Sequence, residues 1–333
     1  MSSEREPQCL RGCWTRGGGG RFAGCANAGE AACDHDEAPD RVRGRVAGNM
    51  GQRSVKTVVV FGGGGVRGMA HAGAWRALRE AGVEPAAIVG TSIGSIVAAC
   101  IATGDSYEVL RRKALEFRKQ DIAVMNRWVV LLNGIRQPGV FRGETLHDFV
   151  TRIVPAVGFS ELALPVAINA VDLGTGEQVW FGAAGLDDVP LQDAVTASCS
   201  LPLFYPPYQL HGRQYVDGGV LDQLPLEHAV LLGADRIIAV DVSGGGVRDA
   251  ATIVSQGLVA IHHRVTEVMG YPRRLRLLRT WSGPPLLYIR PRLEAYSTFD
   301  FGHTELFLEE GYRAAREALG AQPAPAADAL EAG

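Results

Sequence analysis

A serine lies at the centre of Gly90-Thr91-Ser92-Ile93-Gly94, between a short apolar strand and an apolar helix. This Gly-x-Ser-x-Gly spacing is typical of a nucleophile elbow, a tight strand-to-helix turn that exposes the serine oxygen. The glycines relieve crowding in the turn, and the helix that begins at Ile93 points its positive end at the same place. The alternative is an N-cap serine in a glycine-rich turn, and the pentapeptide alone does not separate the two.

A glycine-rich loop follows the preceding strand, one strand-helix unit earlier. It reads Gly63-Gly64-Gly65-Val66-Arg67-Gly68 and opens the next helix. A dinucleotide-binding fingerprint has this spacing but needs an acid at the end of the second strand, and the nearby Glu84 precedes that strand. Free N–H groups at a helix start attract negative charge, so the loop can bind an oxyanion as well as a phosphate. Both loops are expected at the same sheet edge, which favours Ser92 as a nucleophile.

A serine nucleophile needs a general base, and the chain offers two kinds. Three histidines, His262, His263 and His303, follow candidate acids in the Ser-Asp-His order of α/β-hydrolases. Several strands precede the nucleophile strand in those enzymes, whereas one does here. Asp217 instead follows a short strand in the stretch YVDGG at 215–219, where a glycine turn would present its carboxylate to a site. An Asx-turn is the alternative role of this aspartate, because Asp-Gly is a common turn pair.

The ordered motifs resemble the patatin-like phospholipase family. The matching segments are GGGVRG at 63–68, GTSIG at 90–94 and Asp217-Gly218-Gly219, with a further likeness over Ala197–Pro206. The resemblance covers about residues 56 to 243, and more loosely the last helix. It implies a three-layer α/β/α fold and a Ser–Asp dyad of Ser92 and Asp217, with no catalytic histidine, no metal and no cofactor.

In such a dyad Asp217 accepts the proton of Ser92, whose oxygen attacks an ester carbonyl to form an acyl-enzyme that water hydrolyses. The N–H groups of Gly64 and Gly65, and that of Ile93, would hold the oxyanion, each contributing about 3–4 kcal/mol. An aspartate with its ordinary pKa near ~3.9 is a poor base at neutral pH. A partly desolvated site is therefore expected to raise the pKa of Asp217.

The elements that must position these residues alternate between strands and helices. Strands are predicted at 56–61, 87–89, 166–172, 178–181, 214–216 and 236–242. Helices are predicted at 68–81, from the elbow to near 104, at 107–120 and 191–198, near 226–232 and near 304–319. The alternation indicates an α/β fold with a largely parallel central sheet. A hairpin across Gly174-Thr175-Gly176 makes the expected sheet mixed.

Composition sets the class of protein. The chain has 333 residues, of which 47% are hydrophobic and 21% charged, and its net charge of −3 argues against a nucleic-acid binder. No apolar run approaches the roughly 18 residues that span a bilayer. The opening MSSEREPQCL has no apolar segment of a secretory signal. We expect a cytoplasmic protein that can also associate peripherally with a membrane.

Three regions are expected along the chain. Residues 1–53 form a disordered extension rich in Gly, Arg and Cys, residues 54–319 the catalytic domain, and residues 320–333 a loose tail. Met50 precedes the first strand and is a candidate translation start. The extension contains Cys9, Cys13, Cys25, Cys33 and His35, but their spacing does not match paired Cys-x₂-Cys zinc ligands. We therefore predict no metal site.

Several segments bear on the substrate. Arg67 is either a phosphate anchor or the partner of an acid. The apolar stretches Trp128–Leu132 and Leu201–Tyr208 either line an acyl groove or belong to the core. Four arginines either contact anionic lipid or form a solvated helix face; they are Arg273, Arg274, Arg276 and Arg279.

The resemblance implies a phospholipid or another fatty-acyl ester as substrate. Two alternatives stay open: an acyltransferase that uses the same dyad, and a non-catalytic lipid-binding regulator. The sequence leaves the lipid head group, the positional preference and the oligomeric state open.

Overall fold

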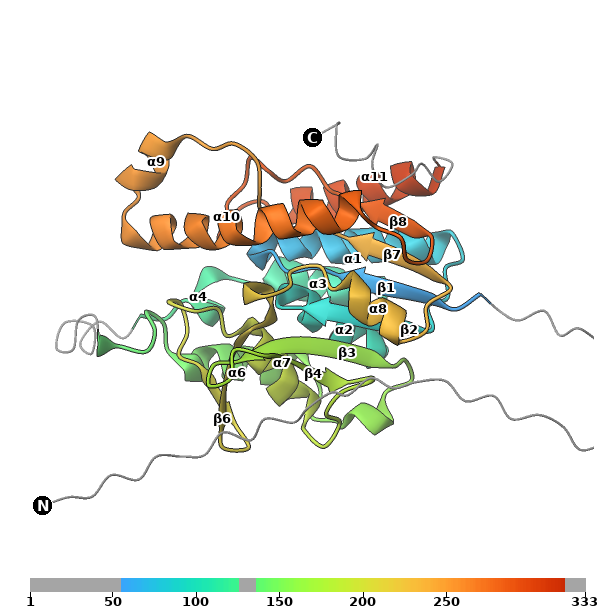
Figure 1. The fold of residues 1–333 in the computed structure, drawn as a ribbon, viewed down its shortest axis with the longest axis horizontal. Helices are drawn as coiled ribbons and strands as arrows, with labels where there is room; N and C mark the ends of the chain where they lie inside the picture. The colour runs from blue at the N-terminus through green and yellow to red at the C-terminus, as the bar shows by residue number, and fades with distance from the viewer. Residues whose placement is uncertain (1–54, 126–135, 321–333) are drawn as a thin grey trace, which may run out of the picture. The chain divides into compact units, whose positions relative to one another are not determined.

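The computed structural model describes residues 55–125 and 136–320. Within them an eight-stranded sheet runs in the order β5-β6-β3-β2-β1-β7-β8, with β4 also paired to β3 (Figure 1). The strands are β1 Thr57–Phe61, β2 Ala87–Thr91, β3 Val166–Asp172, β4 Gln178–Gly182, β5 Tyr208–Leu210, β6 Arg213–Asp217, β7 Arg236–Val240 and β8 Leu286–Ile289. Strands β3, β2, β1, β7 and β8 are parallel neighbours, whereas β4 and β6 pair antiparallel to β3. The predicted mixed α/β sheet and its β3–β4 hairpin are confirmed.

Helices cover both faces of the sheet. They are α1 Met69–Glu80, α2 Ile93–Ala102, α3 Tyr107–Glu116, α4 Lys119–Ile122, α6 Gly143–Ile153, α7 Leu191–Cys199, α8 Leu226–Leu231, α9 Ala250–Ser255, α10 Leu258–Arg279 and α11 Thr304–Gly320. Val59 and Phe61 of β1 share a core with residues of α1, α2, α7 and α11. The alternate residues Val58 and Val60 share a second core with residues of α8 and with Leu278 of α10. The fold is therefore three-layered, with the sheet in the middle.

Strand β1 is buried on both sides because its sequence, TVVVF, is continuously apolar after its first residue. Such runs are typical of central parallel strands, which have helices against both faces. The same reasoning applies to β7, whose sequence is RIIAV. These strands fix the edge from which the glycine loop and the Ser92 turn emerge.

The prediction of one helix over residues 107–120 is wrong. Helix α3 ends at Glu116, Phe117 has extended backbone, and α4 begins at Lys119. The ring of Phe117 is buried against Phe149 and Phe301, with ring centroids 4.7 and 5.3 Å away. Its packing outweighs the local helix propensity that the sequence suggested.

The described α-helices α6 and α9 and the described strands β5 and β8 were not predicted, and of α10 only a helix face at Arg273–Arg279 was considered. Helix α10 contains Pro272, which usually interrupts a helix. None of the described helices combines the length and the apolar character that crossing a bilayer requires. Outside the described residues lie Met50 with the rest of the 1–53 extension and its Cys and His residues, the segment Trp128–Leu132, and all of the predicted tail except Gly320.

Candidate active site

Ser92 lies in the turn between β2 and α2, at the carboxyl edge of the parallel strands. Its backbone has φ 53° and ψ −126°, a conformation that non-glycine residues seldom adopt. A Cβ atom at Gly90 would lie 2.6 Å from the Cα atom of Ser95, and one at Gly94 would overlap the carbonyl of Phe61. Both glycines are therefore required for the sharp turn that exposes the Ser92 side chain.

Asp217 ends β6 and contacts Ser92 directly. The Ser92 hydroxyl donates a hydrogen bond of 2.5 Å to Asp217 Oδ2, and the Gly219 N–H donates one of 2.7 Å to Oδ1. A Cβ atom at Gly218 would overlap the buried side chain of Asn169 on β3. The glycines thus let the turn after β6 pass close to β3 while the carboxylate faces Ser92.

Burial changes the chemistry of this carboxylate. Asp217 is 3% exposed, and loss of hydration raises its pKa from the ordinary value to about 6. The hydrogen bonds from Ser92 and Gly219 act in the opposite direction but are the smaller effects. An aspartate with a pKa near 6 is mostly ionised at neutral pH and is a stronger base than a solvated one.

The glycine loop lies against this turn. The Gly63 N–H donates to the carbonyl of Gln223 at 2.9 Å, so it is occupied. Among the described residues, we find no hydrogen-bond acceptor for the N–H groups of Gly64, Gly65 and Ile93. These three amides are therefore available to an oxyanion, whereas the amide of Gly63 is not.

Close packing holds the loop in place. A Cβ atom at Gly64 would lie 2.5 Å from the Val242 carbonyl, and one at Gly68 would overlap the side chain of Ile93. Two polar residues that sequence reasoning missed also contribute. His71 bonds the Gly62 carbonyl through Nε2 at 2.8 Å, and Ser198 Oγ accepts the Ser92 N–H at 2.9 Å. A clue to Ser198 was its place in the segment 197–206 that resembles the family, but nothing in the sequence marked His71.

An apolar pocket of about 260 Å³ opens beside Ser92 and Asp217. The glycine loop forms part of its wall. Most of the remaining lining is aliphatic or aromatic and comes from segments far apart in the chain; it includes Ile96, Phe117, Leu146, Phe149, Leu201 and Phe204. Leu201, Phe204 and Tyr205 therefore line the pocket, and Phe204 and Tyr205 also belong to the hydrophobic core, so both sequence interpretations of this segment apply.

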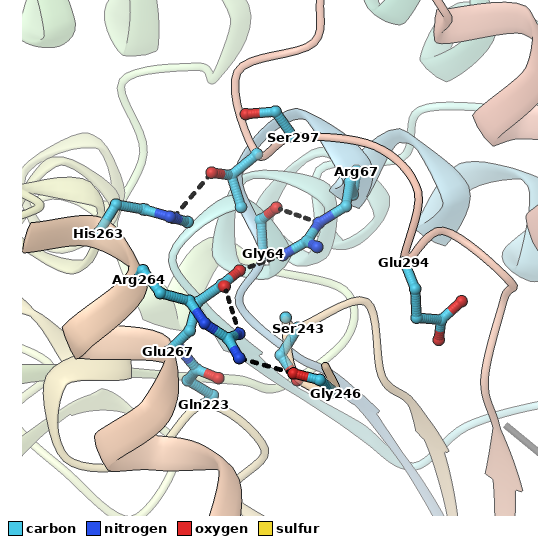
Figure 2. Close-up of polar contacts among 12 residues, drawn as sticks. Gly64, Arg67, Gln223, Ser243, Gly246, His263, Arg264, Glu267, Glu294 and Ser297 are labelled. Carbon is cyan, nitrogen blue, oxygen red and sulfur yellow. Dashed lines mark hydrogen bonds and ion pairs between the residues drawn. The ribbon is translucent and has the colours of Figure 1, made fainter. Parts of the chain in front are cut away.

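The structure decides between the two roles considered for Arg67. Its side chain is 2% exposed, and its Nη2 lies 3.5 Å from Glu267 Oε1 on α10, while Nε donates to the Gly64 carbonyl at 3.3 Å (Figure 2). Burial lowers the pKa of Arg67 to about 10, which leaves it charged at neutral pH. Arg67 is thus the partner of an acid and joins the glycine loop to α10. Sequence reasoning did not single out Glu267.

We expect Glu267→Gln to lower the free energy of unfolding by about 2 kcal/mol, because it removes the counter-ion of the buried Arg67 and of the half-buried Arg264 and Arg248. Urea denaturation at neutral pH measures the change. The matched control is Glu294→Gln, which removes an exposed carboxylate 3.2 Å from Arg290 and is expected to cost less than about 1 kcal/mol. Equal stabilities of the two variants would contradict a structural role for the Arg67–Glu267 pair.

The three candidate histidines are not hydrogen-bonded to Ser92. His262 and His263 line the pocket, and His263 Nε2 bonds the Thr298 hydroxyl at 2.8 Å. His303 is paired with Asp300 at 2.7 Å on the surface. Among the described residues, no group of three or more His, Cys, Asp or Glu side chains could hold a metal ion.

Comparison with known proteins places this geometry in a family. The family model described as Patatin-like phospholipase matches residues 59–230, which contain both Ser92 and Asp217. The chain belongs to the patatin-like phospholipase family. An uncharacterized NTE family protein of Mycobacterium tuberculosis is 34% identical over 205 residues, covering 60% of this chain and 53% of that protein. The lysophospholipase nte1 of Aspergillus fumigatus is 29% identical over 284 residues, covering 78% of this chain and 18% of that protein.

The chain thus spans about half the length of its mycobacterial relative and a smaller part of the fungal enzyme. Among solved structures, VipD from Legionella pneumophila is 14% identical with a TM-score of 0.45, covering 80% of this chain and 66% of that one. The type III effector ExoU is also 14% identical, with a TM-score of 0.40 and coverage of 79% and 52%.

Proposed function

We propose that this chain is a serine lipid acyl hydrolase, a carboxylic ester hydrolase that works through a Ser92–Asp217 dyad and an acyl-enzyme. The observation that carries the proposal is the hydrogen bond from the Ser92 hydroxyl to the buried Asp217 carboxylate beside an apolar pocket. Membership of the family supports the same activity, as does the name lysophospholipase of the fungal relative.

The proposed reaction uses each part of the site in turn. Asp217 takes the proton from Ser92 as Oγ attacks the ester carbonyl, and the amides of Gly64, Gly65 and Ile93 stabilise the oxyanion. The protonated Asp217 then gives its proton to the leaving alcohol as the acyl-enzyme forms. Water, deprotonated by Asp217, attacks the acyl-enzyme, and the fatty acid leaves as Ser92 recovers its proton.

The volume and lining of the pocket favour a fatty-acyl ester as substrate, which could be a phospholipid, a lysophospholipid or a simpler ester. Its predominantly apolar lining would take the acyl chain, while the ester carbonyl lies at Ser92. An acyltransferase is the alternative that keeps the same site, with an alcohol in place of water in the second step. A non-catalytic lipid binder is less consistent with a serine held in a strained turn and bonded to a desolvated carboxylate.

Covalent labelling tests the nucleophile. A fluorophosphonate probe should label the wild-type protein and not Ser92→Ala, because the probe reacts with an activated serine. Ser95→Ala is the matched control: Ser95 lies one helical turn away, with its hydroxyl bonded to the Ser92 carbonyl, and this variant should still be labelled. A panel of nitrophenyl esters, lysophospholipids, phospholipids and triglyceride then identifies the substrate. Labelling of Ser92→Ala at the wild-type level would refute the assignment.

A further inference from the structure

Helix α10 has two opposite faces, although its sequence shows no simple amphipathic pattern. One face is buried and carries Glu267, Arg274 and Leu278. At 3.6 residues per turn the opposite face carries a row of large apolar side chains that remain exposed. Its members are Leu258, Ile261, Val265, Val268 and Met269, of which Val265 and Val268 are each 50% exposed and Met269 is 74% exposed.

The same outer face becomes basic toward the end of the helix. Arg273, Arg276 and Arg279 are exposed there, whereas Arg274 turns inward and lies 3.0 Å from the buried Asp241. For all four arginines, the sequence suggested either contact with anionic lipid or a solvated helix face. Neither role applies to the buried Arg274. Glu267 is the sole carboxylate of α10 and is buried. The outer face of α10 thus presents apolar and cationic groups without an acid.

The apolar half of this face borders the entrance of the Ser92 pocket. Met269 is both strongly exposed and part of the pocket lining, and His262 and Thr266 of α10 also line it. Val220, which follows the Asp217 turn, also lines the pocket and is 39% exposed. A surface that covers the outer face of α10 would therefore also meet the pocket entrance.

We propose that the outer face of α10, from Leu258 to Arg279, is a docking surface for a bilayer that contains anionic phospholipid. This proposal depends on the proposed function in one respect: the bilayer is taken to be the source of the lipid substrate. The apolar half would lie below the headgroups, and Arg273, Arg276 and Arg279 would meet lipid phosphates. A second copy of the same face offers no carboxylate to these arginines, so lipid phosphates complement the charge better.

Vesicle sedimentation tests the docking surface without involving catalysis. All variants are made in the Ser92→Ala protein, so that the lipid is not consumed. Vesicles of phosphatidylcholine mixed with phosphatidylglycerol are compared with vesicles of phosphatidylcholine alone. We expect strong binding to the anionic vesicles and at least tenfold weaker binding for the double variant Val265→Glu, Val268→Glu. Arg276→Gln and Arg279→Gln should each weaken binding to anionic vesicles by roughly fivefold.

Leu231→Glu is the matched control. Leu231 is 75% exposed, more than either valine, but it ends α8 at the edge where β7 begins, opposite Ser92. This control should bind vesicles like its Ser92→Ala parent. In the protein that keeps Ser92, the Val265, Val268 variant should hydrolyse a soluble nitrophenyl ester normally and vesicle phospholipid at least tenfold more slowly.

Three results would overturn the proposal. The first is failure of the Ser92→Ala parent to sediment with anionic vesicles, and the second is equal binding by the valine double variant and the Leu231 control. The third is a dimer that the valine substitutions dissociate while vesicle binding stays unchanged, which would make this face a contact between copies. Vesicle binding without acyl release by the active protein would instead refute the proposed function and leave the docking surface intact.

Discussion

Asp217→Asn is expected to lower turnover by roughly 10⁴-fold, the order seen when an amide replaces the carboxylate of a serine catalytic site. The amide retains the shape of the side chain and an oxygen that can accept the Gly219 N–H, but it cannot take the proton of Ser92. Steady-state hydrolysis of a soluble nitrophenyl ester measures the effect. Retention of more than a few per cent of the activity would exclude Asp217 as the base.

The same substitution is expected to stabilise the fold at neutral pH. The folded-state pKa of Asp217 is raised to about 6, so the folded protein binds this proton more tightly than the unfolded chain. By linkage, this proton stabilises the folded protein fully below the ordinary aspartate pKa, and the stabilisation is lost as pH rises through about 6. Asp217→Asn has no carboxyl group to ionise, so its free energy of unfolding should exceed that of the wild type by up to about 3 kcal/mol above pH 6. Urea denaturation at pH 7 measures it.

Turnover should also fall as pH drops below about 6, because Asp217 must be ionised to act as the base. An imidazole base would titrate close by, near ~6.5, so the pH profile alone does not separate a dyad from a histidine triad. Alanine variants of His262, His263 and His303 make the distinction. Each should keep most of the wild-type activity, since none bonds Ser92 in the described structure. An orders-of-magnitude loss in one of them, with an unchanged circular dichroism spectrum, would refute the dyad.

The central sheet and the turns at Ser92 and Asp217 could be predicted from the sequence because local residue patterns determine them. Continuous apolar runs such as TVVVF indicate buried parallel strands, and the glycines around Ser92 and Asp217 mark turns that no larger residue would fit. Family resemblance added the pairing of these two residues, of which Ser92 follows β2 and Asp217 ends β6. The hydrogen bond between them is a product of the sheet order, in which β6 and β2 both flank β3.

The buried and exposed faces of helix α10, and its contact with Arg67, could not be predicted from local sequence patterns. The helix buries Glu267 and exposes Val265 and Val268, the reverse of the usual pattern, and it continues through Pro272. Polarity alone would therefore have assigned its faces wrongly. The role of Arg67 depended on this helix, since its partner Glu267 is remote in the chain and becomes a neighbour only through the fold.

The second large effect is expected from Gly65→Ala, through the oxyanion loop. Gly65 has φ +62°, and a Cβ atom there would overlap the carbonyl of Thr298, which also accepts the Val66 N–H at 2.9 Å. The added methyl group must displace either the loop or Thr298, and the amide of Gly65 moves away from the carbonyl oxygen of the substrate. Loss of one oxyanion donor lowers kcat by about 10²–10³-fold. We expect that loss with little change in KM, because the donor acts mainly in the transition state.

Gly82→Ala separates this steric effect from backbone strain alone. Gly82 has φ +72°, similar to Gly65, but among the described residues no atom lies within 4 Å of its Cβ position. Both variants therefore have a similar backbone penalty of about 1 kcal/mol in urea denaturation, and Gly65→Ala has the cost of the overlap with Thr298 in addition. Only Gly65→Ala should lose kcat and react slowly with the fluorophosphonate probe. If the two variants turn over substrate equally well, the amide of Gly65 is not an oxyanion donor, and the amides of Gly64 and Ile93 would have to stabilise the transition state alone.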